Sequence, residues 1–379
     1  MKIHILTPGA NCQKSLTFLF PIIFNERRLK DLGIDIFYFK TVEAALFDCD
    51  ILIIDIEYFN YNIRWKTKRI KTEADRREIE VLEKEKIAQL AYCRDKFSPI
   101  ILIDSTASTG HIETDVIPFV DLYCKGQLLK DRSLYRQRII RKGRVFCQFY
   151  HNTFDIHDED PDYSEPLTNE DISKLRIHWN TGLADHSLRR VHYRKLQNRA
   201  QLRPFFRYTK NFSAPSPNRS RDISCRISTH PGSSPTIRFQ RVKVQQLLNH
   251  NTPTEMTSLS RYFKEMAVSK VAMSPFGFGE ICYRDYEIFI CGSLLFKADM
   301  SHLETFPDFY FAGKTYVNYQ WDFSDFEKKI DAILSNYNQF VDIARAGQET
   351  YKKFITSEKG YGVFCRQFQE LLKDAANKP

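Results

Sequence analysis

The sequence predicts an α/β protein in which two domains of mostly parallel β-sheet face each other across a cleft. Short apolar runs rich in β-branched residues alternate with longer runs of helical periodicity, which is typical of βαβ units. The length of 379 residues suits about two domains, each able to bury its own core. A segment rich in Pro, Ser, Asn and Arg separates two halves that both show the alternation.

The first half is expected to form one Rossmann-like domain, residues 1–205. Its apolar runs predict strands at residues 2–7, 34–39, 51–56, 99–104 and 120–124. The stretches between them predict helices at about residues 14–31, 41–47 and 73–96. The last of these is rich in Glu, Lys, Arg and Ala, which favour a helix with a charged outer face.

The composition changes between Pro204 and Pro235, where Pro, Ser, Asn and Arg can continue neither a helix nor a central strand. We therefore expect a linker at residues 206–221 and a second Rossmann-like domain at residues 222–379. Predicted strands in that domain cover residues 222–228, 270–274, 293–297 and 315–318. Predicted helices cover residues 240–249, 255–267 and 281–291, followed by a helical tail at 323–336, 339–355 and 361–374.

Composition excludes several classes of protein. Hydrophobic residues make up 42% of the chain, with 30 Phe and 19 Tyr, which excludes global disorder. No apolar run approaches the roughly 20 residues that cross a bilayer, and the apolar stretch at the N-terminus is too short for a secretory signal. Nine scattered cysteines without a C-x-x-C pair suggest neither a zinc ribbon nor a disulfide framework. We expect a cytoplasmic protein.

Charge is distributed unevenly along the chain. Residues 155–171 are acidic without one Lys or Arg, whereas the basic strip, residues 186–221, holds ten Lys or Arg and no Asp or Glu. The formal net charge of +9 therefore arises in the basic strip. Such a strip suits nucleic acid, anionic lipid headgroups at the inner face of a membrane, or a polyanionic acceptor, and a solvated helix face explains it about as well.

The segment from Ser274 to Gly292 is the densest candidate site. A predicted strand runs into the turn Gly277-Phe278-Gly279 and then into a predicted helix, so backbone N–H groups and the positive helix end are directed at an anion, most plausibly a phosphate. Glu280, Arg284 and Glu287 are spaced at i, i+4 and i+7, which predicts one helical face beside that turn. Arg284 could clamp phosphate oxygens and a carboxylate could accept the hydroxyls of a ribose, although a plain ladder of surface ion pairs has the same spacing.

The run from Arg284 to Leu295 resembles the donor-site motif of group-1-type glycosyltransferases with the GT-B fold, where Arg-x-aromatic-Glu precedes a helix that ends in Cys-Gly. The similarity extends through residues 299–305 and 321–325, as in bacterial surface-polysaccharide members, so it covers roughly residues 270–330. The N-terminal half resembles this family only in its alternation of predicted strands and helices.

This resemblance implies that Glu287 holds the ribose of a nucleotide-sugar and that Arg284 meets its phosphates. It also implies that Gly277, Phe278 and Gly279 lie against the donor and that Lys270 adds positive charge. Many retaining members have a glutamate directly before Gly-Phe-Gly, where this chain has Pro275-Phe276 and places Glu280 after the glycines instead. Glu280 thus becomes a candidate catalytic residue, and the stereochemical outcome stays open.

Enzymes of this kind are similar in needing no metal, because helix dipoles and basic side chains neutralise the leaving diphosphate. We therefore expect no metal site and no cofactor beyond the nucleotide-sugar co-substrate. A catalytic base is predicted to project from the N-terminal domain, and Asp104 is the candidate because it ends a strong apolar strand. The ordinary alternative for Asp104 is a cap of the following turn.

A histidine follows the first predicted strand of the second domain, with an arginine on either side of it in the sequence. His230-Pro231 is similar to the His-Pro of sialyltransferase- and Kdo-transferase-type enzymes, and Arg226 and Arg238 flank it. His230 and Arg226 are therefore predicted to contact a phosphate of the donor, and the alternative for His230 is an ordinary loop histidine beside proline.

The sequence thus predicts a metal-independent glycosyltransferase that moves a sugar from a nucleotide-sugar to a glycan, a lipid-linked molecule or another hydroxyl acceptor. Peripheral contact with membrane headgroups is expected through the basic strip, and nucleic acid is not expected as a partner. Two alternatives stay open: a nucleic-acid-binding protein that uses the basic strip, and an inactive nucleotide-binding scaffold. The sugar, the base of the nucleotide and the oligomeric state are not fixed by the sequence.

Overall fold

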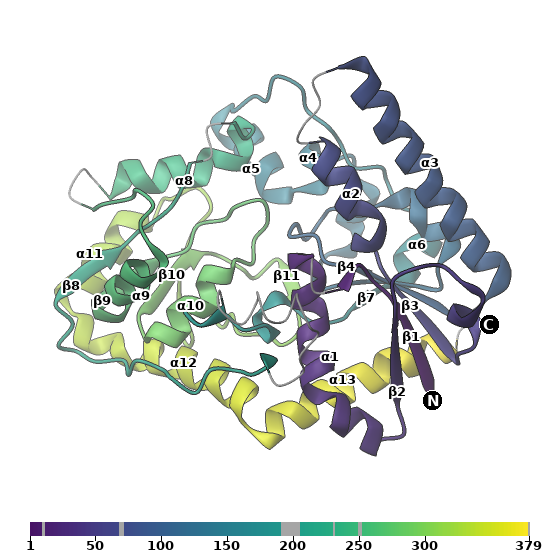
Figure 1. Ribbon diagram of the computed structural model, residues 1–379. Coiled ribbons are helices and arrows are strands. Elements are labelled where there is room, and N and C mark those ends of the chain that lie inside the picture. The colour runs from purple at the N-terminus through teal and green to yellow at the C-terminus, as the bar shows by residue number, and fades with distance from the viewer. Residues whose placement is uncertain (10–11, 68–71, 191–204, 230–231, 249–251, 378–379) are drawn as a thin grey trace.

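A computed structural model describes residues 1–9, 12–67, 72–190, 205–229, 232–248 and 252–377. Its two halves each contain a parallel β-sheet with helices packed around it (Figure 1). The predicted α/β fold class, with two Rossmann-like sheets and a helical C-terminal segment, is confirmed. None of the helices within these residues is long and apolar enough to span a membrane.

The N-terminal sheet has six strands in the order β2-β1-β3-β4-β5-β7, and all neighbours pair in parallel. The strands are β1 (Lys2–Leu6), β2 (Asp35–Phe39), β3 (Ile51–Asp55), β4 (Ile100–Asp104), β5 (Leu122–Lys125) and β7 (Leu175–Ile177). Every residue of β3, β4 and β5 is buried, because helices cover both faces of a parallel sheet. The carboxyl ends of these strands therefore form one edge from which loops carry side chains toward the other half.

The helices of the first half are α1 (Gln13–Asp31), α2 (Glu57–Thr67), α3 (Glu73–Lys96), α4 (Ile140–Gly143), α5 (Val145–Phe154) and α6 (Asn169–Lys174), with 3₁₀ turns at Ala44–Phe47, Thr114–Phe119, Arg132–Arg136 and Thr181–Leu183. In α3 the Thr72 hydroxyl accepts from the Asp75 N–H while the Asp75 carboxylate accepts from the Thr72 N–H, a capping box that fixes where the helix begins. α1 is the helix that follows β1. Its N-terminus therefore lies at the same edge of the sheet as the carboxyl ends of the strands.

The C-terminal sheet has four parallel strands in the order β12-β10-β9-β8. They are β8 (Arg221–Ser224), β9 (Ser269–Met273), β10 (Leu294–Ala298) and β12 (Val317–Tyr319). The helices are α8 (Pro235–Leu247), α9 (Leu259–Val268), α10 (Tyr283–Cys291), α11 (Phe326–Ser335), α12 (Val341–Thr356) and α13 (Glu358–Ala376), with a 3₁₀ turn at Tyr337–Gln339. α10 ends at Gly292, whose φ of 67° is the left-handed conformation that a helix C-terminus favours in glycine.

Several predicted boundaries are wrong. The helix expected at 41–47 is a single 3₁₀ turn, Ala44–Phe47. The helix expected from 240 begins earlier, at Pro235, because proline fits the first turn of a helix, where no N–H is needed. The helix expected from 281 begins at Tyr283, so Glu280 precedes it and does not share a helical face with Arg284 and Glu287.

The two halves are joined by elements that the sequence pattern does not reveal. β6 (Gln127–Leu129) of the first half pairs in antiparallel fashion with β11 (Leu303–Thr305) of the second. Asn180 continues this seam, since its side-chain amide donates to Thr305 Oγ1 at 3.1 Å and to the Pro307 carbonyl at 2.6 Å. Three-residue strands have too little periodicity to be recognised in a sequence.

The C-terminal helix also crosses from one half to the other. α13 runs beneath both halves and ends near β1 and the N-terminus (Figure 1). Its Phe364 and Phe368 rings pack against Trp179 of the first half at centroid distances of 5.0 and 5.8 Å. One continuous apolar core consequently runs through both halves and holds them in a fixed relation.

Candidate functional site

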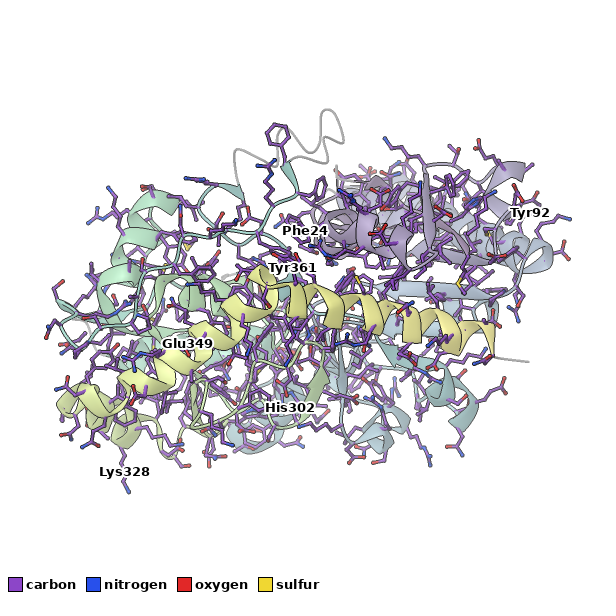
Figure 2. The ribbon with its side chains drawn as sticks, turned by 90° about the horizontal axis from the view of Figure 1, so that it is seen from below. Phe24, Tyr92, His302, Lys328, Glu349 and Tyr361 are labelled. Atoms are coloured by element: carbon purple, nitrogen blue, oxygen red, sulfur yellow. The ribbon has the colours of Figure 1, made fainter. Side chains whose placement is uncertain are left out.

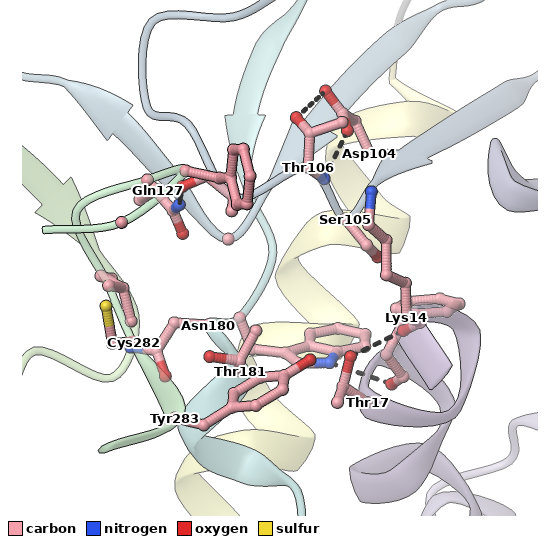
Figure 3. A pocket seen from close by; sticks show the side chains of 18 of the residues that line it. Lys14, Thr17, Asp104, Ser105, Thr106, Gln127, Asn180, Thr181, Cys282 and Tyr283 are labelled. Carbon is pink, nitrogen blue, oxygen red and sulfur yellow. Dashed lines mark hydrogen bonds between the residues drawn. The ribbon is translucent and has the colours of Figure 1, made fainter. Parts of the chain in front are cut away.

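A cavity of about 290 Å³ lies between the two sheets. Its wall from the first half consists of the N-terminal turn of α1, the loop after β4 and the segments that follow β5 and β7. Its wall from the second half consists of Arg241 on α8 and the stretch Gly277–Tyr283 that leads into α10. Figure 3 shows Lys14 and Asp104 on one side of this space and Cys282 on the other. The cavity is therefore where ligands of open α/β sheets bind.

The turn Gly277-Phe278-Gly279 lines the cavity as the sequence predicts. A Cβ on Gly279 would overlap the Ala107 carbonyl of the loop after β4, so glycine is required for the two halves to approach here. A Cβ on Gly277 would overlap the guanidinium of Arg241. Phe278 is half exposed at the mouth, and its carbonyl accepts from Arg144 Nε at 2.9 Å. The turn thus brings backbone close to any ligand in the cavity.

Positive charge enters the cavity from both halves. Arg241 donates from Nε to the Phe276 carbonyl and from Nη1 to the Ser228 carbonyl, each at 2.9 Å, which fixes its guanidinium beside the glycine turn. Lys14 lies opposite, in the first turn of α1, with its Nζ 3.2 Å from the Glu57 carboxylate. α1 has no acidic residue in its first turn, so its positive end is not neutralised there. An anion between Lys14 and Arg241 would be attracted from both sides.

Polar side chains from the segment after β7 complete the wall. His178 is buried, and burial lowers the pKa of its imidazole to about 3. Because its Nδ1 accepts from the Trp179 N–H at 2.6 Å, the neutral ring carries its proton on Nε2. Nε2 has no hydrogen-bond partner among the described residues. His178 therefore lines the cavity as a neutral ring, and its Nε2–H group is buried within the wall.

Asp104 lines the cavity at the end of β4, where the sequence places it, but its carboxylate is fully engaged. It accepts from Lys125 Nζ at 2.8 Å, from the Tyr123 hydroxyl at 2.7 Å, and from the Thr106 N–H at 2.7 Å. Although burial alone would raise its pKa, the Lys125 ammonium and these donors hold the pKa of Asp104 well below its usual range. Such a carboxylate is a weak proton acceptor, so these contacts favour the capping alternative over the predicted catalytic base.

Glu280 is buried at the seam between the halves and does not line the cavity. Its Oε2 accepts from the Thr109 N–H at 3.0 Å, and its Oε1 lies 3.7 Å from His302 Nε2. Burial would raise the pKa of Glu280, but His302 and Thr109 hold it below its usual value. This geometry gives Glu280 a positioning role, since it fastens the loop after β4 to the glycine turn.

Neither Arg284 nor Glu287 lines the cavity. Arg284 Nη2 donates to the Arg226 carbonyl at 2.7 Å, and its Nε lies 3.3 Å from the Tyr262 hydroxyl. Glu287 accepts from that hydroxyl at 2.9 Å and is ion-paired with Arg190 of the basic strip at 2.6 Å. The structure therefore does not bring either side chain to the glycine turn, and their predicted contacts with the donor stay predictions.

The other predicted donor-binding residues do not line the cavity either. Arg226 is ion-paired with Glu265 at 2.6 Å and donates to the Glu255 carbonyl. Lys270 lies near the start of β9, at the opposite end of the strand from the glycine turn, and pairs with Asp222 at 2.7 Å. His230 lies outside the described residues.

The sequence reasoning missed Lys14, Arg241 and His178. A signal for Lys14 was present, because the turn Pro8-Gly9 follows the first strand and precedes a helix, which is where α/β folds bind phosphate. Arg241 and His178 reach the cavity only through the packing of distant segments, and nothing in their local pattern marks them. Among the described residues, no group of three or more His, Cys, Asp or Glu is arranged to hold a metal ion.

A further buried carboxylate lies behind Lys14. Asp55, at the end of β3, accepts from the Thr7 hydroxyl at 2.8 Å and from the Glu57 N–H at 3.1 Å. Burial raises its pKa to about 6. A raised carboxyl pKa means that the folded state binds the proton more tightly than the unfolded state, so stability falls as pH rises from about 4 to 6.

We expect Asp55→Asn to remove this pH dependence. Urea unfolding of both proteins between pH 4 and pH 8 should show the wild type losing about 3 kcal/mol relative to the variant as pH rises through that window. The substitution changes one acceptor into a donor at every pH, which alters the free energy of unfolding by the same amount throughout. The two proteins are therefore compared by the slope of that free energy against pH. Parallel stability curves for the two proteins would contradict the prediction.

Comparisons with known proteins give distant structural similarities. No protein-family model matches the sequence, and no curated protein matches it. Among solved structures, the chain is similar to Alr3699/HepE of Anabaena in complex with UDP, at 10% identity and a TM-score of 0.42, covering 98% of this chain and 100% of that one. It is also similar to a glycosyltransferase of Rickettsia africae, at 9% identity and a TM-score of 0.43, covering 100% and 99% of the two chains. An alpha-glucosyltransferase in complex with UDP-glucose and DNA containing an abasic site has 10% identity and a TM-score of 0.37, covering 98% and 99%.

Proposed function

We propose that the protein is a glycosyltransferase that binds the diphosphate of a nucleotide-sugar in the cavity between its two halves. The main support for this proposal is that the glycine turn, Arg241 and Lys14 all line one cavity. The motif between Arg284 and Leu295, which resembles the donor site of group-1-type glycosyltransferases, lies directly after that turn. A diphosphate there would receive two cations and the positive end of α1, whereas Asp285 already occupies the first turn of α10.

The chemistry follows from where charge develops. An acceptor hydroxyl forms a bond to the anomeric carbon as the bond from that carbon to the diphosphate breaks, and negative charge grows on the leaving diphosphate, which takes up the hydroxyl proton. Arg241 and Lys14 would stabilise that charge without a metal, because a low-dielectric cavity strengthens such interactions. Asp104 holds Lys125 and Thr106 in place behind the reacting groups.

A thermal-shift screen tests the proposal most simply. The purified protein would be heated with uridine, guanosine, thymidine, adenosine and cytidine nucleotides, because a ligand that binds only the folded state raises the Tm. We expect one nucleoside diphosphate to raise the Tm more than its monophosphate, and the matching nucleotide-sugar to release that diphosphate when incubated with the enzyme. If no nucleotide shifts the Tm, the proposal fails.

Arg241→Lys is expected to weaken binding of that diphosphate by roughly 10- to 100-fold, because lysine keeps the charge but loses the planar fork that is fixed beside Gly277. Isothermal titration calorimetry measures the change. The matched control is Arg261→Lys, which alters an exposed arginine on α9 that does not line the cavity. Equal affinity of Arg241→Lys and the wild type would exclude Arg241 from the donor site.

A nucleic-acid-binding role for the basic strip is less well supported. Arg219 is buried and donates to the Met266, Ser269 and Cys291 carbonyls, and Arg221 lies 3.8 Å from Glu265. Arg190 is paired with Glu287. Three arginines of the strip are thus used within the fold, which leaves fewer charges for a polyanionic strand.

A further inference from the structure

A second cavity, of about 720 Å³, opens beside the basic strip. It lies where α1, the start of the strip and the α12–α13 corner meet, and four basic residues line it against one acidic residue. The basic residues are Arg28, Arg189, Arg207 and Lys210, and the acidic residue is Asp185. A concave space of this size with an excess of cations suits an anionic ligand.

Three of these cations are available to a ligand. Arg189, Arg207 and Lys210 are exposed, and within the described part of the chain none of them makes a salt bridge or a hydrogen bond. Arg28 differs, because it donates to both carboxylate oxygens of Glu358, at 2.6 and 3.1 Å. The Asp185 carboxylate accepts from the Ser187 N–H at 2.9 Å; burial raises its pKa, and the charges of Arg190 and Arg189 oppose that rise, so Asp185 offsets part of the positive charge. The unpaired charge of the cavity is therefore positive.

Three aromatic rings form the floor between those cations. Phe24, Tyr208 and Tyr361 are half-buried, and Phe24 lies 4.7 Å from Tyr208 and 5.0 Å from Tyr361 between ring centroids. Figure 2 shows Phe24 and Tyr361 close together above α13. The Arg28 guanidinium lies 4.5 Å over the Tyr361 ring and 5.9 Å over the Phe24 ring, and the ring faces that Arg28 does not cover are apolar surfaces on which the C–H faces of sugar rings can pack. A cavity with aromatic rings and free guanidinium groups combines two features that an anionic sugar would use.

A smaller hollow lies between the second cavity and the candidate donor site. This hollow has a volume of about 50 Å³ and shares Thr17 and Tyr283 with the donor cavity. It shares Asp185 with the second cavity. The three spaces therefore follow α1 from its N-terminal turn to Arg28, so a chain-like acceptor with its reacting end at the donor could extend into the second cavity.

We infer that the second cavity binds an anionic sugar of the acceptor, and that the acceptor of the proposed glycosyltransferase is an acidic glycan. This inference rests on the proposed function, because only a transferase has an acceptor. Carboxylate or phosphate groups of the acceptor would pair with the cations Arg189, Arg207 and Lys210. Its sugar rings would pack against Phe24, Tyr208 and Tyr361. A neutral glycan would leave the three cations without partners.

The test uses hexagalacturonate as an acidic probe and maltohexaose as a neutral probe of the same length, titrated into the full-length protein by calorimetry. The variant Arg207→Glu/Lys210→Glu reverses two charges of the cavity. Its matched control, Lys314→Glu/Lys328→Glu, makes the same change of charge at two exposed lysines that do not line the cavity. Lys328 lies at the far end of the other half (Figure 2).

We expect hexagalacturonate to bind the wild type and the control, and to bind the cavity variant at least 10-fold more weakly, with maltohexaose binding none of them. Equal weakening in both variants would show a non-specific charge effect, and equal binding of maltohexaose would show that the cations are not used; either result overturns the inference. Tighter binding of a single-stranded RNA hexamer, or of phosphatidylglycerol vesicles, with the same loss in the cavity variant would overturn it in favour of nucleic acid or a membrane.

The nucleotide screen tests the proposed function independently of acidic-glycan binding, so failure of one can be told from failure of the other. The cavity variant is expected to keep the wild-type Tm shift with the preferred nucleoside diphosphate, because Arg207 and Lys210 do not line the donor cavity. Acidic-glycan binding without any nucleotide shift would contradict the transferase and leave an anionic-glycan-binding protein. A nucleotide shift without acidic-glycan binding would contradict only the acceptor assignment.

Discussion

Gly279→Ala is expected to lower nucleotide affinity by roughly 10- to 100-fold and stability by about 1–3 kcal/mol. The added Cβ would overlap the Ala107 carbonyl and come within 2.9 Å of the Ala107 Cβ, and both groups belong to the opposite half. Backbone cannot move aside as the end of a flexible side chain can. The glycine turn and the loop after β4 would therefore be pushed apart where they jointly line the cavity.

The matched control is Gly232→Ala, because a Cβ at that glycine has no neighbour within 4 Å. Urea unfolding and calorimetric titration of both variants separate the loss of stability from the loss of affinity. Gly232→Ala should resemble the wild type in both measurements. Wild-type affinity in Gly279→Ala would show that the contact between the halves does not shape the donor site.

Lys125→Met is expected to destabilise the protein by about 3–5 kcal/mol, the cost of leaving a buried charge without its partner. Lys125 and Asp104 are both fully buried, with Lys125 Nζ at 2.8 Å from the Asp104 carboxylate. Lys125 Nζ also donates to Thr106 Oγ1 at 2.6 Å and to the His111 carbonyl at 2.8 Å. Removing the ammonium would leave the Asp104 carboxylate buried with only the neutral donors Tyr123 and Thr106, so that burial becomes the main influence on its pKa.

The pH dependence identifies this cause. In the wild type the low pKa of Asp104 contributes stability above about pH 4. That contribution is lost as the pH falls below the pKa that Asp104 has in the unfolded chain. In Lys125→Met we expect the opposite sign, with stability rising as pH falls from 7 towards 4, because burial then raises the pKa of Asp104. Asp104→Asn should recover part of the loss when combined with Lys125→Met.

The control for this pair is Lys373→Met, which removes the partner of Glu370 in an exposed ion pair of similar length, 2.9 Å. Its effect should stay within about 0.5 kcal/mol, since exposed ion pairs contribute little. A Lys125→Met protein as stable as Lys373→Met would contradict the ionised state of Asp104. The predicted catalytic base would then become available again.

Local signals in the sequence predicted the parts of the site that lie within one strand–turn–helix unit. The turn at Gly277 and Gly279 follows β9 and precedes α10, and Asp104 ends β4, as their patterns indicate. Both segments line the cavity because the carboxyl ends of parallel strands meet at one edge of a sheet.

Contacts between residues far apart in the sequence determine the parts of the site that the local sequence pattern did not predict. The spacing of Glu280, Arg284 and Glu287 suggested one helical face, but α10 begins at Tyr283, so only Arg284 and Glu287 lie on it, where both contact the Tyr262 hydroxyl. Other partners of the three side chains, Thr109, the Arg226 carbonyl and Arg190, are far away in the sequence. A residue spacing specifies a helical face only after the first residue of the helix is known.

The central claim is that a donor diphosphate lies between the two halves, held by Lys14 from one and Arg241 from the other. A double-mutant cycle tests it directly, with calorimetric titration of the preferred nucleoside diphosphate into the wild type, Lys14→Met, Arg241→Lys and the double variant. We predict that each single change weakens binding by roughly 10-fold or more and that the two losses are not additive, because both cations contact one ligand. Wild-type affinity in both single variants would contradict the claim.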